Sequence, residues 1–348
     1  MYALAAVTIA LGVPFFLLLG VDIYLHHKFE RSAGFNVWGY RGPVAGRKTA
    51  DEYRVVVLGG SAAYGYGTNW DEAIPAVLER NLTGRAVGPF RRFTVINLGY
   101  NNEGAYSFTF TLKDYLWLKY DVACLYEGYN DLMGDPSAPN LSVFRHDSPV
   151  FRLTGYLPIF PIVFKEKAAA MLTGTTATLY LNAPKTVFRP GLTTKAAAEV
   201  LRGAAEVGQS LEQQLGRVTA EPARHIEDPA STGCKDPWQQ YCRSTMEAVD
   251  FALQHGAHVL VVTQPHGVGP YFRARHAEQQ AEMAAMLDRR YPGDPRVRYV
   301  NLGDTLDLSD PTLSFDRMHL TAVGNERAAA GFVRPVLEMA AQRAAETR

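Results

Sequence analysis

Five short runs of apolar, β-branched residues divide the chain into regular units. The runs are continuous rather than alternating, which is typical of strands covered on both faces. Between several of them, apolar residues recur every three or four positions, as in an amphipathic helix. The five predicted strands are residues 54–58, 93–98, 122–126, 258–263 and 297–302.

Helix signals follow the predicted strands. Asp71 can cap a helix over residues 74–82, and Thr321 can cap a last helix that runs towards residue 341. Residues 106–119 and 274–289 are further helical patterns. This alternation predicts a three-layer α/β/α fold with a five-stranded, flavodoxin-like parallel sheet in the order 2-1-3-4-5. Ligands of such sheets bind at the carboxyl ends of the strands, where the chain reverses between strands 1 and 3.

The alternation of strand and helix patterns stops between residues 136 and 238, where the sequence is rich in Pro, Thr and Ala and contains helical stretches. An insertion of this length is expected to form a helical cap over the strand ends. We therefore divide the chain into an N-terminal segment (1–25), a linker (26–50) and one main domain (51–342) that contains the cap (136–238). The sequence NVWGYRGP at residues 36–43 is the distinctive part of the linker.

The first 21 residues carry no charge, and as a helix they are long enough to cross a hydrocarbon core of roughly 30 Å. No Lys or Arg precedes them and no small-residue cleavage site follows. An uncleaved transmembrane anchor over residues 1–25 is therefore favoured over a signal peptide or a buried helix. Lys28 and Arg31 follow the anchor, which by the positive-inside rule places the domain in the cytoplasm, although the N-terminal flank is short for this comparison.

Composition narrows the choice of partners. Thirty-five basic residues balance 35 acidic ones, so charge indicates no nucleic acid or other polyanion.

Cys124 lies in a predicted strand and is expected to be a buried thiol. Cys234 and Cys242 can pair if the domain is exported, but a helix starting at Pro237 would separate their Cα atoms beyond about 7 Å, so this disulfide stays open. The chain contains neither CxxC nor HExxH, and no metal site is predicted.

Candidate chemistry begins at the end of the first strand, in Gly59-Gly60-Ser61. A strand-to-helix turn often needs glycine and a capping serine in any protein, so this triplet alone is weak evidence for a nucleophile. Ala63 stands where the GxSxG elbow needs its second glycine, and neither GxxxxGK[ST] nor GxGxxG follows the strand. An α/β-hydrolase elbow and a phosphate-binding loop are therefore disfavoured.

Asp316 and His319 lie three residues apart, just before the last predicted helix. A loop at this spacing can bring the carboxylate to Nδ1 of the imidazole, which leaves Nε2 able to take a serine proton. The pair follows strand 5, whose end lies on the same sheet edge as Ser61. Although a lone DxxH is often a surface loop, this position makes Ser61, His319 and Asp316 a candidate triad.

Acyl transfer also needs hydrogen-bond donors for an oxyanion. Asn130 follows strand 3, across the switch point from Ser61, and its amide can point there; an ordinary turn is the alternative. After strand 2, either Gly99 or Gly104 can present a backbone N–H to the same place, and the N–H of Ser61 is a further donor. His266, after strand 4, also lies at this edge, but a local hydrogen bond is its more ordinary role.

Together these blocks resemble the SGNH (GDSL-type) hydrolase family, named after serine, glycine, asparagine and histidine. The resemblance covers about residues 50–342. It is carried in the family's order by Gly59-Gly60-Ser61, a glycine after strand 2, Gly128-Tyr129-Asn130-Asp131 and Asp316-Arg317-Met318-His319.

Three details refine the resemblance. Gly60 replaces the aspartate of GDS, as in a GGS subgroup. The family's oxyanion glycine usually begins a Gly-x-x-Ser/Thr run, which fits residues 104–107 and favours Gly104 over Gly99. The NVWGYRGP linker is similar to that of membrane-anchored bacterial members. Tyr64, Tyr66 and Tyr129 flank the proposed site and can line a pocket or simply pack.

The resemblance implies a serine esterase in which Ser61 attacks, His319 takes its proton and Asp316 orients the imidazole. The N–H groups of Ser61 and Gly104 and the side chain of Asn130 then hold the oxyanion, with no metal or organic cofactor. O-acetyl esters of a polysaccharide are the expected substrates, and the domain is expected outside the cytoplasm, against the charge argument. An O-acyltransferase and a non-catalytic carbohydrate-binding domain stay open as alternatives.

Overall fold

A five-stranded parallel sheet forms the centre of the domain. The computed structural model describes residues 2–132, 140–173, 185–188 and 232–346. Its strands are β1 (Glu52–Leu58), β2 (Arg92–Asn97), β3 (Val122–Glu127), β4 (His258–Thr263) and β5 (Val297–Asn301), in the order β2-β1-β3-β4-β5. The predicted strands and their order are confirmed, with boundaries that agree within two residues.

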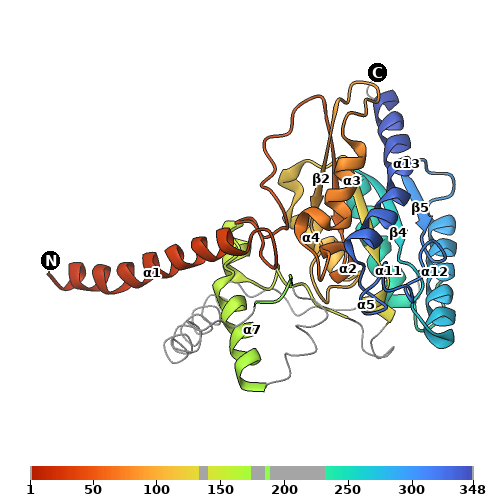
Figure 1. The fold of residues 1–348 in the computed structure, drawn as a ribbon. Helices are drawn as coiled ribbons and strands as arrows, with labels where there is room; N and C mark the ends of the chain where they lie inside the picture. The colour runs from red at the N-terminus through yellow and green to blue at the C-terminus, as the bar shows by residue number, and fades with distance from the viewer. Residues whose placement is uncertain (1, 133–139, 174–184, 189–231, 347–348) are drawn as a thin grey trace.

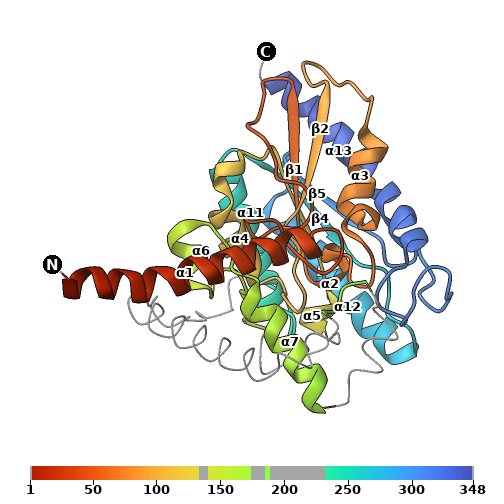
Figure 2. The same cartoon turned by 60° about the vertical axis from the view of Figure 1, so that its left-hand side comes forward.

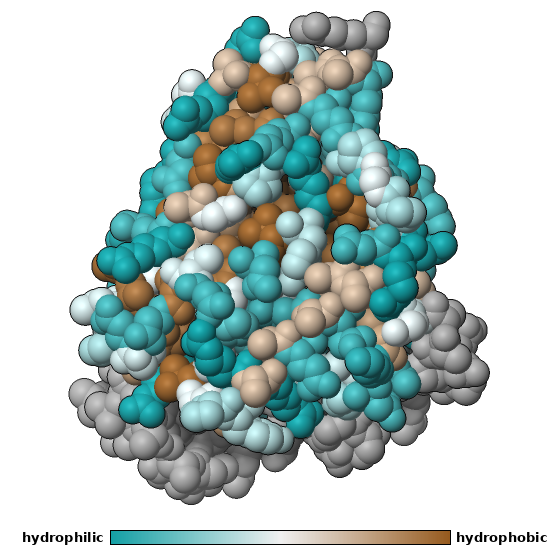
Figure 3. Space-filling model, turned by 90° about the vertical axis from the view of Figure 1, so that its right-hand side faces the viewer, coloured by the Kyte–Doolittle hydropathy of each residue, from teal (hydrophilic) through white to brown (hydrophobic). Residues whose placement is uncertain are grey.

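Helices cover both faces of the sheet and complete three layers (Figures 1 and 2). On one face lie α3 (Ile74–Leu82) and α13 (Ala322–Glu346), which pack against each other. On the other lie α4 (Ser107–Asp114), α11 (Gln239–Gln254) and α12 (Pro270–Arg290). Every residue of β1 and β4 is buried, which explains their continuous apolar runs. The edge strand β5 is only half-buried, and hydrophobic patches lie between hydrophilic side chains on this side (Figure 3).

The predicted helix caps have different outcomes. Thr321 caps α13, because its Oγ1 accepts a 3.1 Å hydrogen bond from the N–H of Gly324. The prediction for Asp71 is wrong, since Asp71 lies inside a separate 3₁₀ turn, η1 (Trp70–Glu72), and α3 begins only after Ala73. The helix predicted over residues 106–119 is divided into α4 and a second 3₁₀ turn, η2 (Leu116–Leu118).

The N-terminal helix α1 (Tyr2–Phe29) extends away from the domain and reaches it at its C-terminal end (Figure 1). Within the described residues, no helix is long and apolar enough to cross a membrane, so the predicted transmembrane anchor is not found. Near the domain, in the last two turns of α1, the polar side chains of Asp22 and His26 are buried, at 2% and 4% exposed.

Asp22 and His26 attach the end of α1 to the domain. Oδ1 of Asp22 accepts hydrogen bonds from the N–H groups of Ile159 (2.8 Å) and Phe160 (2.6 Å), where α7 (Phe160–Thr173) begins. The two ring nitrogens of His26 lie 2.8 Å from the carbonyl of Phe35 and 2.9 Å from that of Leu157. Because a carbonyl only accepts, both bonds form when both nitrogens carry hydrogen, that is, in the imidazolium.

Two predicted segments lie partly or wholly within the described residues. The segment at residues 36–43 contributes the buried side chains of Asn36, Tyr40 and Arg41 to the domain. From the predicted cap, the structure describes α6 (Pro149–Thr154) and α7. Most of the helical sequence predicted for the cap, including KAAAEVLRGAAEVGQSLEQQL at residues 195–215, lies outside the described residues.

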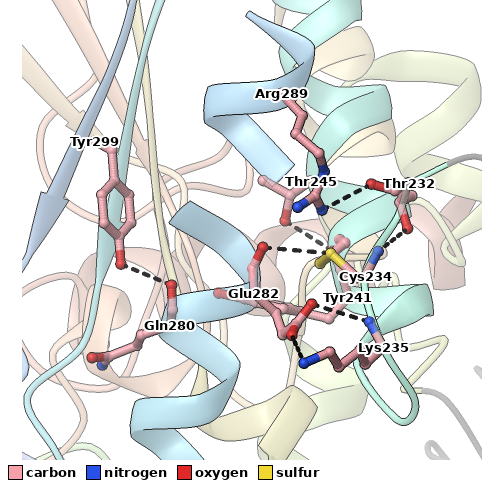
Figure 4. Close-up of a disulfide and its surroundings, with 10 residues drawn as sticks. Thr232, Cys234, Lys235, Tyr241, Thr245, Gln280, Glu282, Arg289 and Tyr299 are labelled. Carbon is pink, nitrogen blue, oxygen red and sulfur yellow. Dashed lines mark hydrogen bonds and ion pairs between the residues drawn. A yellow bond between two sulfur atoms is a disulfide. The ribbon is translucent and has the colours of Figure 1, made fainter. Parts of the chain in front are cut away.

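Cys234 and Cys242 form a disulfide with a Cα–Cα distance of 6.6 Å (Figure 4). The predicted helix from Pro237, which would have separated the two cysteines too far, is wrong. Helix α11 begins at Gln239, so part of the intervening segment is a turn. Lys235 adds a contact with α12, since its N–H donates to Oε2 of Glu282 at 3.1 Å. Cys124 is a buried free thiol, as predicted.

Candidate active site

Ser61 begins a one-turn helix, α2 (Ser61–Tyr64), directly after β1. A Cβ on Gly59 would lie 2.0 Å from the carbonyl oxygen of Tyr126 on β3, so only glycine fits where β1 leaves the sheet. The turn is closed by Gly65, which has φ of 82° and donates its N–H to the carbonyl of Ser61 at 3.0 Å. Gly60, between Gly59 and Ser61, has an ordinary φ of −79°.

Asp316 and His319 lie in the loop between β5 and α13. Oδ1 of Asp316 accepts hydrogen bonds from the N–H groups of Met318 (3.0 Å) and His319 (2.7 Å), and this turns the loop back on itself. Oδ2 of the same carboxylate then lies 2.6 Å from Nδ1 of His319. Arg317, between them, takes the left-handed conformation with φ of 68°.

The imidazole of His319 connects this loop to the end of β1. Its Nε2 lies 2.8 Å from Oγ of Ser61. With Nδ1–H donating to Asp316, Nε2 carries the lone pair that accepts the serine proton. Burial alone would raise the pKa of Asp316. The hydrogen bond and charge of His319, together with the two N–H groups, outweigh this effect. The pKa of Asp316 is therefore lowered, and its carboxylate stays ionised. This arrangement can activate a hydroxyl nucleophile.

Aromatic rings surround the histidine. The ring of Tyr66 lies 4.8 Å from that of His319, and the ring of Phe315 stacks on it at 5.9 Å. Burial raises the pKa of Tyr66 to about 12, so its hydroxyl stays neutral at ordinary pH. The side chains of His319 and Asp316 remain 14% and 20% exposed, which leaves the imidazole accessible to a small substrate.

Asn130, in a short helix, and Gly104, in a loop, lie in two segments that are joined by hydrogen bonds. Nδ2 of Asn130, in α5 (Tyr129–Leu132), donates to the carbonyl of Glu103 at 2.7 Å. Oδ2 of Asp131 accepts the N–H of Ala105 at 2.9 Å, and a Cβ on Gly104 would lie 2.8 Å from Oδ1 of the same carboxylate. Asp131 therefore fixes the backbone on the C-terminal side of Gly104, and a side chain at position 104 would displace it.

The two candidate oxyanion glycines differ in their N–H groups. Gly99 donates its N–H to Oδ1 of Asn97 at 3.0 Å, and a Cβ there would lie 2.6 Å from the backbone nitrogen of Tyr64. Gly99 thus serves the packing of α2 against β2. In the described part of the chain, no hydrogen bond from the N–H of Gly104 to another group is present.

Glu103 is a buried acid beside this loop that the sequence analysis did not identify. Its Oε1 accepts the N–H of Phe144 at 2.8 Å, and its Oε2 lies 3.4 Å from the guanidinium of Arg145. Burial raises the pKa of Glu103 to about 7, although Arg145 and the N–H of Phe144 lower it. A charged residue inside NNEGAYS, next to the candidate glycine, was the available sequence signal.

The remaining candidates have local roles. The ring nitrogens of His266 lie 3.2 Å from Asp304 and 3.0 Å from Gln280, so both are engaged away from the triad. The hydroxyl of Tyr64 donates to the carbonyl of Ala33, and that of Tyr129 to the carbonyl of Pro265. Of the three tyrosines proposed to line a pocket, Tyr66 is the one whose ring contacts the triad histidine.

Comparisons with known proteins give structural similarity at low sequence identity. No protein-family model matches the chain, and no curated protein matches it. A lipolytic protein of the G-D-S-L family from Desulfitobacterium hafniense DCB-2 is 11% identical, with a TM-score of 0.42 over 81% of this chain and 98% of its own. The acetyl-xylooligosaccharide esterase Axe2 from Geobacillus, as a mutant, is 12% identical, with a TM-score of 0.43 over 83% and 96%.

A third similar structure is LAE5, an α/β hydrolase enzyme from the metagenome of Lake Arreo, Spain. It is 14% identical, with a TM-score of 0.43 over 82% of this chain and 94% of its own. These TM-scores lie below 0.5, and the geometry of Ser61, His319 and Asp316 is the evidence for function.

Proposed function

We propose that this protein is a serine esterase of the SGNH type. The observation that carries the proposal is the chain of hydrogen bonds from Oγ of Ser61 to Nε2 of His319 (2.8 Å) and from Nδ1 to Asp316 (2.6 Å). These three residues come from two distant segments, and their atoms lie in the order that proton removal from a serine requires.

In the proposed reaction, Oγ of Ser61 attacks the ester carbonyl carbon while its proton passes to Nε2 of His319. The N–H groups of Ser61 and Gly104 and the amide of Asn130 hold the negative oxygen of the tetrahedral intermediate. Collapse breaks the ester C–O bond, and His319 returns the proton to the leaving alcohol. Water, deprotonated by His319, then attacks the acyl enzyme and releases the acid and free Ser61, while Asp316 stabilises the imidazolium throughout.

The assignment of Gly104 as an oxyanion donor is supported by the hydrogen bonds around it. Gly99 already donates its N–H to Asn97, whereas Asp131 and Asn130 hold the residues on either side of Gly104. Nδ2 of Asn130 donates to the carbonyl of Glu103 at 2.7 Å, and this bond orients the amide. The loop is therefore held in place before substrate binds, as electrostatic stabilisation requires.

We propose O-acetyl esters of a polysaccharide as substrates, and a domain that acts outside the cytoplasm. The Cys234–Cys242 disulfide supports this location, because disulfides persist in oxidising compartments. It weighs against the cytoplasmic orientation that Lys28 and Arg31 suggest by charge alone. A small acyl group is also compatible with a histidine flanked closely by Tyr66 and Phe315.

The test is hydrolysis of p-nitrophenyl acetate and of acetylated oligosaccharides by the wild type, Ser61→Ala and Ser309→Ala. Ser309 is an exposed loop serine and serves as the matched control. We expect Ser61→Ala to lose at least about 10³-fold in kcat and Ser309→Ala to retain activity. Acetyl transfer to a sugar acceptor far exceeding acetate release would identify an acyltransferase instead. Equal rates for the wild type and Ser61→Ala would contradict a serine mechanism.

A further inference from the structure

Arg41 is a buried cation whose partners are backbone carbonyls. It lies in the segment of residues 36–43 and is 2% exposed. Among the described residues it forms no ion pair with a carboxylate. Its guanidinium instead donates to the carbonyls of Tyr64, Gly65, Ser32 and Thr68. A charge removed from water in this way needs such partners, and carbonyls at the end of a helix attract cations.

Two of these carbonyls belong to the turn that carries Ser61. Tyr64 is the last residue of α2, and Gly65 is its C-cap. Nη1 of Arg41 donates to both, at 3.0 Å for Gly65, and the guanidinium lies 4.2 Å from the centre of the Tyr64 ring. A single helical turn is unstable by itself, and its terminal carbonyls need partners when buried. The geometry of α2 therefore depends on contacts from outside. Arg41 donates to the carbonyls of both Tyr64 and Gly65, whereas Nδ2 of Asn97 donates only to that of Tyr64, at 3.2 Å.

The same contacts connect α2 to the end of α1. Nη2 of Arg41 donates to the carbonyl of Ser32 at 2.7 Å, three residues after α1 ends. The hydroxyl of Tyr64 donates to the carbonyl of Ala33 at 2.8 Å. On the other side, the N–H of Trp70 donates to the carbonyl of Arg31 at 3.0 Å. Residues 31–33 are thus fixed to the segment that follows Ser61.

We propose that Arg41 is a positioning residue for Ser61. It touches neither substrate nor the triad, and it acts by holding the C-terminal end of α2 so that Oγ of Ser61 stays in line with Nε2 of His319. This inference rests on the proposed esterase function. A displacement of a nucleophile by about 1 Å can cost 10²-fold in rate, so loss of Arg41 lowers kcat more than it changes KM.

Two variants distinguish positioning from general stability. Arg41→Lys keeps the charge, but a single ammonium cannot span the carbonyls of α2 and those of Ser32 and Thr68 together. Arg41→Ala leaves a space that includes the position of the missing guanidinium group. Free guanidinium at millimolar concentration is expected to enter this space and restore part of kcat, which a merely destabilised protein would not show. Arg47→Ala is the matched control, since Arg47 is exposed in the same N-terminal segment.

The experiment measures kcat and KM for p-nitrophenyl acetate in the wild type, both Arg41 variants, Arg47→Ala and Ser61→Ala, together with thermal unfolding. We expect kcat to fall by at most about tenfold in Arg41→Lys and by about 10²-fold in Arg41→Ala. The KM of both variants should stay within about threefold of the wild-type value. Guanidinium should raise kcat of Arg41→Ala and leave that of Ser61→Ala unchanged.

Folded Arg41 variants with wild-type kcat, or an Arg41→Ala variant that guanidinium does not rescue, would overturn the positioning role. So would failure of both variants to fold, because Arg41 would then be a residue of general stability. Activity in Ser61→Ala would instead overturn the proposed function, so the two failures are distinguishable.

Discussion

Nε2 of His319 lies 2.8 Å from Oγ of Ser61, although 258 residues separate the two along the chain. The sheet order brings them together: β1 ends at Ser61, and the loop after β5 returns across the same edge before α13. Each side chain is held locally, Ser61 by the α2 turn and His319 by Asp316. The short distance therefore joins two segments that are each held by their own hydrogen bonds.

Removal of the imidazole should abolish most of the activity. Among the described residues, Nε2 of His319 is the one group hydrogen-bonded to Oγ of Ser61, so His319→Ala leaves no described group to take its proton. We expect kcat to fall by about 10²- to 10⁴-fold, the usual value of a general base, with an unchanged melting temperature. Steady-state kinetics and thermal unfolding test this, with His27→Ala as the exposed control. Turnover within about tenfold of the wild type would contradict the role of His319.

The Asn130 amide should act on the transition state more than on substrate binding. Asn130→Ala removes the proposed oxyanion donor, and kcat is expected to fall by about 10²- to 10³-fold while KM changes little. Asn140→Ala is the control, because the side chain of Asn140 makes an exposed hydrogen bond to the carbonyl of Asn102. If KM rises while kcat is retained, Asn130 binds substrate rather than stabilising the oxyanion.

The attachment of α1 should weaken as pH rises. Burial lowers the pKa of His26, but Asp22 and the carbonyls of Phe35 and Leu157 outweigh it, so the pKa is raised above 6.5. The folded protein then holds this proton more tightly than the unfolded chain. Its stabilising contribution is present below pH 6.5 and is lost as pH rises through the folded-state pKa.

Thermal unfolding between about pH 5.5 and 9 measures this loss. The wild type and His27→Gln should lose stability over the interval, since the side chain of His27 is 88% exposed. His26→Gln, which cannot be protonated at position 26, should lack the part of this pH-dependent loss of stability that comes from His26. A profile in His26→Gln that matches the wild type would show that another group is responsible.

Reduction of the disulfide should destabilise the domain. Cys234 and Cys242 are eight positions apart, and the chain-entropy relation for a loop of this size gives about 2.5 kcal/mol. Urea unfolding with and without reductant measures the difference, and a double Cys234→Ser, Cys242→Ser variant should reproduce it. Cys124 is left unchanged because its thiol is buried. Identical unfolding midpoints for the oxidised and reduced protein would contradict a stabilising disulfide.

The sheet was predictable because its strands are buried on both faces. A strand such as β4 has six buried residues in succession, and this appears directly as a continuous apolar run. The proximity of Ser61 and His319 followed from the same sheet, since parallel strands deliver their ends to one edge. The contact of Asp316 with the imidazole was predicted from its three-residue spacing to His319.

Other features depend on backbone positions that the sequence does not display. Arg41 binds carbonyl oxygens, which every residue has, so nothing in the residue types of its partners identified them. The disulfide depended on where α11 begins, and a shift of two residues reversed the geometric argument. Asp71 could not be assigned because two capping positions, one for η1 and one for α3, lie within five residues.

The most direct test of the central claim is covalent labelling of Ser61. The folded protein is treated with a fluorophosphonate, and the modified peptide is identified by mass spectrometry in the wild type, Ser61→Ala and Ser309→Ala. We expect one adduct, on Ser61, in the wild type and in Ser309→Ala, and none in Ser61→Ala. An adduct on another residue, or equal labelling of Ser61→Ala and the wild type, would contradict Ser61 as the nucleophile.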